Sequence, residues 1–174
     1  LVMLCFFYSC KKEQTVEKND QPAEIAQEGD DVKRSITGLS AKRGLISKTD
    51  KATEGFVLFQ PSSSTKTYLI NSDGNVVHQW VGELNSMQSY LLENGNLIRL
   101  ERDVDFPTFA AGGQSGRIRE YDWQGNVVWD FEHATIDQLI HHDIEIMPNG
   151  NILAISYEVI SREDAIEAGM HPDR

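Results

Sequence analysis

The chain has 174 residues, with 27 acidic and 16 basic side chains, and its formal net charge at pH 7 is −11. Nucleic-acid binding is dominated by Lys and Arg contacts to phosphate, so this charge balance argues against a nucleic-acid partner. The two cysteines, Cys5 and Cys10, both lie near the first residue, so no disulfide is expected in the rest of the chain.

Residues 1–10 (LVMLCFFYSC) form an apolar run that is too short to span a bilayer. The run ends at Ser9-Cys10, and a polar stretch begins at Lys11. This pattern is typical of the truncated end of a signal peptide, with the processing site of a bacterial lipoprotein. We therefore expect lipidation at Cys10 and an exported protein, held in the periplasm or at the outer membrane by a lipid anchor. An ordinary signal peptide or a stray hydrophobic segment is the alternative.

Residues 11–31 are rich in Glu, Gln, Asp, Asn and Lys and poor in large apolar side chains, which predicts a flexible polar tether. The folded part is expected over residues 32–174. Its first clear strand is Gly55–Gln60 (GFVLFQ), followed by a turn at Pro61–Thr65 and a second strand at Lys66–Asn71.

A hairpin signature, made of two apolar runs around a glycine turn, occurs four times. The copies are LINSDGNVVHQW (69–80), YLLENGNLIRL (90–100), EYDWQGNVVWDF (120–131) and EIMPNGNILAI (145–155). The first and third copies are 51 positions apart, and the second and fourth are 55 apart. The dipeptides Asn94-Gly95 and Asn149-Gly150 predict hairpin turns of type I′.

Two such hairpins supply four strands in about 50 residues, which is the size of one β-propeller blade. A blade cannot bury both of its faces alone, so neighbouring blades must stack against it. The predicted fold class is therefore all-β, a propeller of four-stranded blades. The sequence holds two to three blades, whereas ring closure needs at least about four, so we expect the chain to be a fragment of a longer protein.

Two segments interrupt the hairpin pattern. Residues 103–115 (DVDFPTFAAGGQS) contain Pro and two adjacent glycines and predict a loop on one face of the sheets, which is either a functional loop or a variable surface excursion. Residues 161–169 (SREDAIEAG) predict a short helix, capped by Ser161 and ended by Gly169, with a structural role.

The triplet His141-His142-Asp143, at the start of the fourth hairpin, is the main candidate site. Adjacent side chains of a strand point to opposite faces, so one histidine should face the propeller channel and the other should pack between blades. Asp143 should share the face of His141 or orient the neighbouring backbone, and it is a candidate substrate-binding residue. The histidines could act as a base or nucleophile, or hold an anion, or simply be satisfied members of a hydrogen-bond network. Diverging rings chelate poorly, so no metal is expected.

Other histidines and the tryptophans are expected to be structural. His78 lies in the middle of a strand and His133 at the end of one, where imidazole rings pack readily. Indole rings should fill the spaces between blades, with their N–H groups bonded to the backbone. These tryptophans are Trp80, Trp123 and Trp129.

Arg117 and Arg119 alternate with Ile118 and therefore share one strand face. Two guanidinium groups on one face could grip a sulfate through paired hydrogen bonds. Exposed arginines without such a role are commoner on strands, which is the alternative to this assignment to a substrate site.

The sequence contains no phosphate-binding glycine loop, dinucleotide fingerprint, HExxH or GxSxG motif. From Gly55 onward it resembles the bacterial arylsulfate sulfotransferase family over about 120 of the 174 residues. The resemblance rests on the order of TYLINSDGNVVHQW, SYLLENGNLIRL, GGQSGRIREYDWQGNVVWDFEH and HHDIEIMPNGNILAISYE, and above all on the His-His-Asp triplet.

This resemblance implies a six-bladed propeller enzyme that transfers a sulfuryl group from an aryl sulfate to a phenol without a nucleotide or other cofactor. A channel histidine attacks the sulfur, and the sulfohistidine then delivers the group to the second phenol. His142 matches a histidine that contacts the sulfate or the phenolic oxygen, with His141 as runner-up. The sulfated histidine belongs to a later blade, so we expect this fragment to be inactive alone. The alternative is a non-catalytic propeller that binds a ligand at the bacterial envelope.

Overall fold

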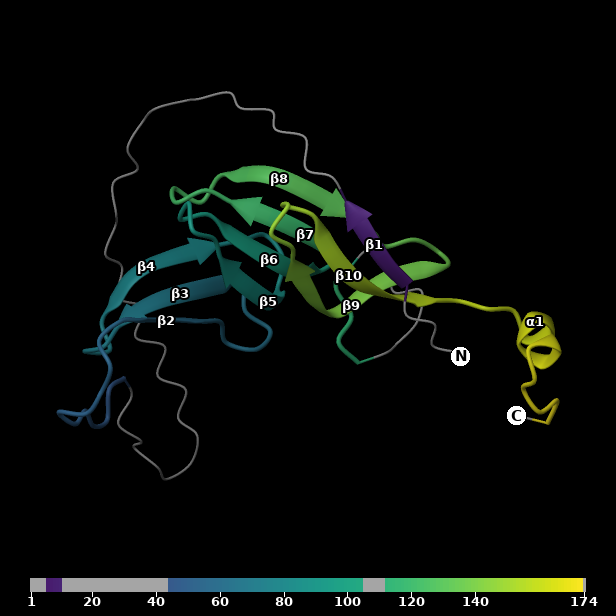
Figure 1. The fold of residues 1–174 in the computed structure, drawn as a ribbon, viewed down its shortest axis with the longest axis horizontal. Coiled ribbons are helices and arrows are strands. Elements are labelled where there is room, and N and C mark those ends of the chain that lie inside the picture. Colours follow the sequence, from purple (N-terminus) through teal and green to yellow (C-terminus); the bar gives the residue numbers. More distant parts are fainter. Residues whose placement is uncertain (1–5, 11–43, 105–111, 174) are drawn as a thin grey trace.

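The computed structural model describes residues 6–10, 44–104 and 112–173 (Figure 1). Within these ranges the chain forms ten strands and one short helix. None of the helical structure in them is long and apolar enough to cross a membrane. The tether predicted for residues 11–31 lies outside the described residues.

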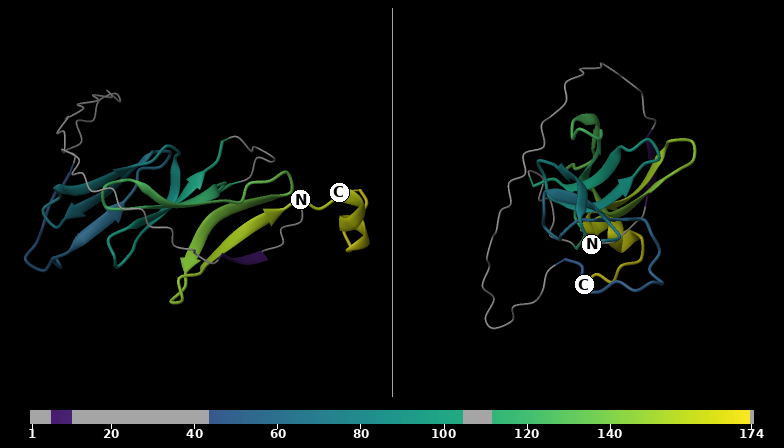
Figure 2. Two further views of the ribbon diagram at one scale, coloured as in Figure 1. Left: turned by 90° about the horizontal axis from the view of Figure 1, so that it is seen from above. Right: turned by 90° about the vertical axis from the view of Figure 1, so that its left-hand side faces the viewer.

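The strands form three antiparallel sheets that follow one another along the molecule (Figures 1 and 2). The first sheet contains β2 (Phe56–Phe59), β3 (Lys66–Asn71) and β4 (Val76–Val81). The second contains β5 (Ser86–Leu91), β6 (Leu97–Arg102), β7 (Gly116–Tyr121) and β8 (Val127–Glu132). The third has the order β1-β10-β9, from β1 (Phe6–Cys10), β9 (Gln138–Ile146) and β10 (Ile152–Glu158). The all-β prediction is confirmed, and none of the three sheets is closed.

The four predicted hairpins are present, but their turns are not of type I′. In the second hairpin, Gly95 has φ +85° and its N–H donates to the carbonyl of Leu92 at 2.9 Å. A type I′ turn needs positive φ at two central residues, yet Ser63 and His142 are the only described non-glycines with positive φ. The geometry fits a turn followed by a left-handed glycine at a bulge. The Asn-Gly dipeptide predicted the hairpins correctly and the turn type wrongly.

Hydrophobic side chains join the three sheets through two clusters. The cluster between the first and second sheets contains Leu69, Trp80, Leu97 and Tyr121. The cluster between the second and third contains Ile98, Leu100, Ile118, Ile140, Ile144, Ile152 and Ala154. Full burial of an Ile or Leu side chain stabilises by about 1.5–3 kcal/mol, so these clusters hold the sheets face to face.

The edge of the third sheet is formed by a segment from the other end of the chain. Phe6–Cys10 pairs antiparallel with β10, from Phe6 opposite Ser156 to Cys10 opposite Ile152. β9 and β10 correspond to β5 and β6 of the second sheet. β1 is therefore the third strand of its sheet, as β7 is in the second sheet. The signal-peptide and lipidation assignments for residues 1–10 concern processing and stay predictions.

The predicted helix is present as α1 (Arg162–Glu167). Ser161 caps it, because its side-chain oxygen accepts a hydrogen bond from the N–H of Asp164 at 3.0 Å. Gly169, with φ +105°, follows the end of the helix, as the sequence predicted. The helix lies beyond β10 and away from the stacked sheets (Figure 1), so it does not contribute to the candidate site.

Candidate functional site

A bulge in β9 positions the His-His-Asp triplet. Ile140 pairs with Ser156 and Ile144 pairs with Ala154, so residues 141–143 stand opposite a single residue of β10. A bulge of this kind breaks the simple alternation of side chains and changes the direction in which they point. The triplet lies within β9, where a regular strand was expected from the sequence. The bulge disrupts that regular geometry at these three residues.

His142 is held in the left-handed backbone region, with φ +58°. Its N–H donates to the carbonyl of Gly113 at 2.7 Å, which fixes the strained residue against the loop before β7. The position of Gly113 has φ +71°, and a Cβ placed there would lie 2.5 Å from the His142 ring. A glycine is therefore required at 113, both for its own backbone and for the space that the imidazole occupies.

The two imidazole rings are bonded to each other. Their Nδ1 atoms are 2.7 Å apart, and the rings meet edge to face at 86°. His141 is only 4% exposed and stacks on Tyr157 with 3.7 Å between ring centroids, whereas His142 is exposed. The hydroxyl of Tyr157 donates to the carbonyl of Gly112 at 3.0 Å, which ties the stack to the same loop. The prediction that adjacent rings diverge was wrong, because the bulge and the left-handed His142 bring them together.

The contact between the Nδ1 atoms restricts where the protons lie. One ring must donate from Nδ1 and the other must accept, so the pair cannot be doubly protonated and keep this bond. Burial, and then repulsion from His142, lower the pKa of His141. Its Nε2 is buried and has no hydrogen-bond partner among the described residues. A buried N–H without a partner is rarer than an unpaired acceptor, which favours His141 with its proton on Nδ1. His142 then accepts at Nδ1 and presents an N–H at Nε2.

Asp143 is bonded to a tyrosine of the second sheet. It is exposed like His142, so the prediction that it shares the face of the buried His141 was wrong. Its carboxylate accepts a hydrogen bond from the hydroxyl of Tyr90 on β5 and another from the N–H of Ile144, the latter at 2.8 Å. Burial, and then this carboxylate, raise the pKa of Tyr90, so the tyrosine stays protonated and anchors Asp143.

Tyr157, Gly113 and Tyr90 complete the site and were not assigned from the sequence. The adjacent glycines of residues 103–115 marked a loop, and that loop packs against His142 at Gly113. Residues 105–111 of it lie outside the described residues. For Tyr90 and Tyr157 the sequence carried no signal beyond their places in hairpin strands.

Arg117 and Arg119 do share a strand face, but carboxylates already bind both guanidinium groups. Arg117 bonds Asp130 through Nε and Nη2, at 2.8 and 3.1 Å. Arg119 bonds Asp130 at 3.1 Å, Glu83 at 3.1 Å and Glu101 at 3.3 Å. An incoming sulfate would have to displace these partners. The geometry therefore gives no support to a sulfate grip by this pair, and we leave it out of the site.

The same network continues into a fully buried ion pair. Arg99 and Glu101 are both 0% exposed, with Nη1 and Oε1 3.0 Å apart, and Glu101 also accepts from the Tyr121 hydroxyl at 2.8 Å. Burial raises the pKa of Glu101, and Arg99 partly counters the effect. Arg99 donates to the carbonyl of Leu84 at 3.1 Å, and a Cβ on Gly82 would lie 1.7 Å from its Nη1. The pair thus connects the chain after β4 to the second sheet.

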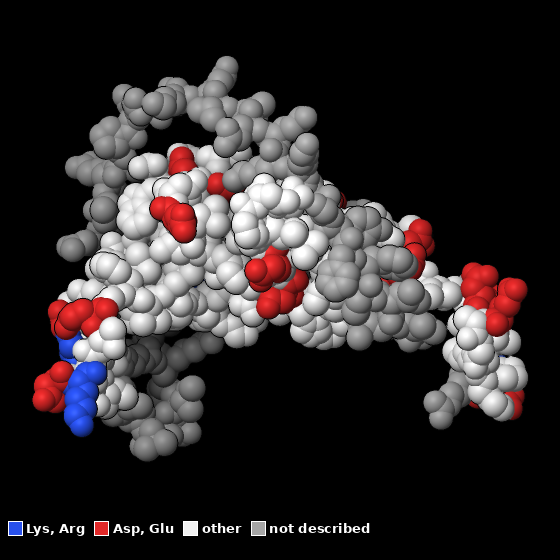
Figure 3. All heavy atoms as spheres, in the orientation of Figure 1, with Lys and Arg blue, Asp and Glu red and all other residues white. Residues whose placement is uncertain are grey.

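On the face drawn in Figure 3, acidic side chains are spread widely and basic ones are visible at one end only.

His78 and His133 occupy packed positions. The His78 ring stacks on Trp123 at 4.0 Å and meets the edge of Trp80 at 4.3 Å between centroids. The indole N–H of Trp80 donates to the carbonyl of Asp122 at 2.9 Å, as predicted for a tryptophan between sheets. Burial lowers the pKa of both histidines. The His133 ring lies parallel to that of Phe131, with 6.2 Å between centroids, so packing accounts for both rings.

Within the described ranges, no group of three or more His, Cys, Asp or Glu side chains is placed to hold a metal ion. A scan against protein-family models and searches of curated proteins and of solved structures find no match to this chain. The function must therefore be argued from the site itself.

Proposed function

We propose that this chain forms the first blades of an exported β-propeller enzyme that transfers a sulfuryl group from an aryl sulfate to a phenol. The observation that carries the proposal is the histidine pair, in which a left-handed His142 presents an exposed ring that is bonded to the buried His141. A strained non-glycine backbone costs about 1–3 kcal/mol, and such residues cluster at ligand and catalytic sites. A histidine that served only packing would not need this conformation.

The arrangement of the sheets supports a propeller. The second sheet is a simple meander of four strands, and β9-β10 repeats the pairing of β5-β6. Sheets that follow each other in the chain pack face to face, as blades do. The first strands of two successive sheets meet where Tyr90 of β5 donates to Asp143 of β9. In a propeller these first strands line the central channel, which is where the triplet would then lie.

The proposed role of His142 is to donate a hydrogen bond from Nε2 to an oxygen on which charge develops. When the bond between sulfur and the aryl oxygen breaks, its electron pair stays on the phenolate oxygen. A donor fixed in place beforehand stabilises that charge without reorganising. His141 keeps the His142 ring in the donating tautomer, and Tyr90 with Asp143 fixes the backbone beside it. In this proposal the attacking histidine lies in a blade outside this chain.

The two transfers balance as a double displacement. The attacking ring nitrogen forms a bond to sulfur while the donor's sulfur–oxygen bond breaks, and a phenolate leaves. The acceptor phenol then bonds to sulfur while the nitrogen–sulfur bond breaks. The proton that the acceptor loses neutralises the phenolate that was released. The histidine is regenerated, so no metal or nucleotide is consumed.

The test uses the complete polypeptide that contains this segment, incubated with p-nitrophenyl sulfate and phenol. We expect release of nitrophenol that depends on phenol. His142→Ala should lower kcat by about 10²–10³-fold, as loss of a charge-stabilising donor does, and the packed His78→Ala should lower it far less. Equal effects of the two substitutions would reject the site. A folded protein that releases no nitrophenol would instead support a propeller that only binds its ligand.

A further inference from the structure

The start of β5 (Ser86–Gln88) repeats the middle of β9, where the His-His-Asp triplet lies. Adding 55 to each residue number takes the pair Ser89–Arg99 to Ile144–Ala154, and both pairs are opposite each other in their sheets. The same shift takes Met87 to residue 142. The internal repeat therefore assigns a counterpart in the second sheet to each member of the His-His-Asp triplet.

The counterparts share a bulge and a burial pattern but not a backbone conformation, because three residues of β9 oppose one residue of β10 and His142 has positive φ, whereas β5 has one extra residue and Met87 does not have positive φ. β5 has its own bulge, because Ser86 pairs with Glu101 and Gln88 with Leu100, which leaves Met87 as the extra residue. Ser86 is 2% exposed, like buried His141, and Met87 is 38% exposed, like the exposed His142. In both sheets the bulge therefore presents a buried side chain followed by an exposed one.

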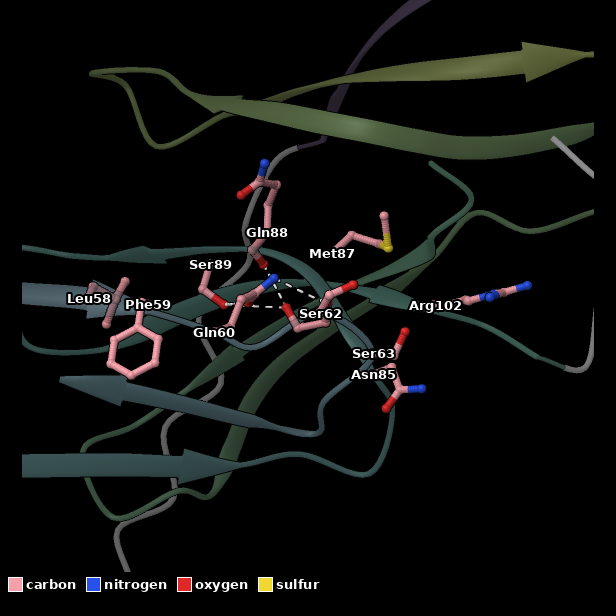
Figure 4. A pocket seen from close by; sticks show the side chains of 11 residues that line it. Leu58, Phe59, Gln60, Ser62, Ser63, Asn85, Met87, Gln88, Ser89 and Arg102 are labelled. Carbon is pink, nitrogen blue, oxygen red and sulfur yellow. Dashed lines mark hydrogen bonds between the residues drawn. The ribbon is translucent and has the colours of Figure 1, made fainter. Parts of the chain in front are cut away.

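A cavity of about 360 Å³ opens beside Met87, between the end of β2 and the start of β5 (Figure 4). Its volume falls at the lower end of the range of about 300–1,000 Å³ that small-molecule sites occupy. Apolar walls come from Leu58, Phe59 and Met87. Figure 4 shows the polar side chains of Gln60 and Ser89 at its centre, with Phe59 and Met87 on either side.

The polar groups of this cavity are held in place. Gln60 donates from Nε2 to the carbonyl of Ser86 at 3.0 Å and accepts from the hydroxyl of Ser89. Arg102, at the rim, donates to the side chain of Gln114 at 3.3 Å, and Gln114 forms a β-bridge with His141. Arg102 and Gln114 therefore connect the wall of the cavity to the histidine pair.

We propose that this cavity binds the aromatic ring of a phenol as a subsite next to the histidine pair. Phe59 offers a face for ring stacking, and the thioether of Met87 offers a sulfur–aromatic contact. The choice of a phenol over other small aromatic molecules rests on the proposed function, whereas the cavity, the bulge and the repeat do not.

The experiment measures binding of 4-fluorophenol to the chain by ¹⁹F NMR line broadening, with no sulfate donor present. We expect saturable binding at millimolar concentrations and weak competition by cyclohexanol, which has the same ring size but no π face. Met87→Ala should weaken binding about threefold to tenfold, as loss of a sulfur–aromatic contact implies, and Phe59→Ala should weaken it similarly. Met147→Ala removes a methionine from the β9–β10 turn and should leave binding unchanged.

Absence of broadening with the wild-type chain, or equal affinity in the wild type, Met87→Ala and Phe59→Ala, would overturn the subsite. The same experiments distinguish a failure of the subsite from a failure of the proposed function. Specific binding without any sulfuryl transfer by the complete polypeptide leaves the subsite standing and removes the proposed function. Transfer with an unchanged KM for phenol in Met87→Ala removes the subsite alone.

Discussion

Two adjacent glycines allow a sharp test of how the histidine pair is held. Gly113 has φ +71°, and an added Cβ would lie 2.5 Å from the His142 ring, whereas a Cβ on Gly112 would meet nothing within 4 Å. A left-handed conformation costs a non-glycine residue about 1–2 kcal/mol. Gly113→Ala should therefore destabilise the fold by at least this amount and also move the His142 ring.

The free energy of unfolding can be measured in urea, and the melting temperature by circular dichroism. For a chain of this size, about 1–2 kcal/mol corresponds to a fall of roughly 2–8 °C in Tm. Gly112→Ala is the matched control and should change Tm far less. NMR of the imidazole nitrogens should show that the Nδ1–Nδ1 hydrogen bond is lost in Gly113→Ala and kept in Gly112→Ala. Equal Tm values for the two variants, with the bond intact in both, would refute the reasoning.

Three further outcomes follow from charge and burial. The pKa of His141 is lowered in the folded state, so the unfolded chain binds the proton more tightly. Stability therefore falls as the pH drops below about 6.5. The urea midpoints measured at about pH 7.5 and about pH 5.5 should differ less in His141→Gln than in the wild type. Glu101→Leu leaves Arg99 buried without its closest carboxylate and should cost about 3–5 kcal/mol in the free energy of unfolding. The double variant Arg99→Met/Glu101→Leu should recover part of that loss, and a double variant less stable than Glu101→Leu would contradict this account.

The hairpins were predictable because glycine turns flanked by apolar runs are a local signal. Gly95 and Gly150 lie at turns with φ +85° and +81°, where the sequence placed turns. The turn type was not predictable from the Asn-Gly dipeptide alone, because two hairpin classes accept Asn followed by Gly and differ in register. Local chemistry therefore specified where the chain reverses, and strand pairing decided how.

The His-His-Asp triplet could be singled out from the sequence, but its geometry could not be predicted. Alternation along a regular strand would separate the rings of His141 and His142, and it fails because a bulge and one left-handed residue intervene. No local signal marks that conformation at a histidine, since it is stabilised by Gly113 from a distant loop. Likewise, alternation correctly placed Arg117 and Arg119 on one face, but it could not reveal the carboxylates that the tertiary fold brings to them.

The pairing of residues 6–10 with β10 ties together two segments that are far apart in the sequence. Main-chain hydrogen bonds recognise an extended backbone and carry almost no information about side chains. Processing at Cys10, as the sequence predicts, would remove Phe6–Ser9 and leave the N–H and C=O groups on that edge of β10 without partners, while the pairing of β10 with β9 would remain. That edge of β10 would then be open to pairing with another extended segment, whatever its side chains.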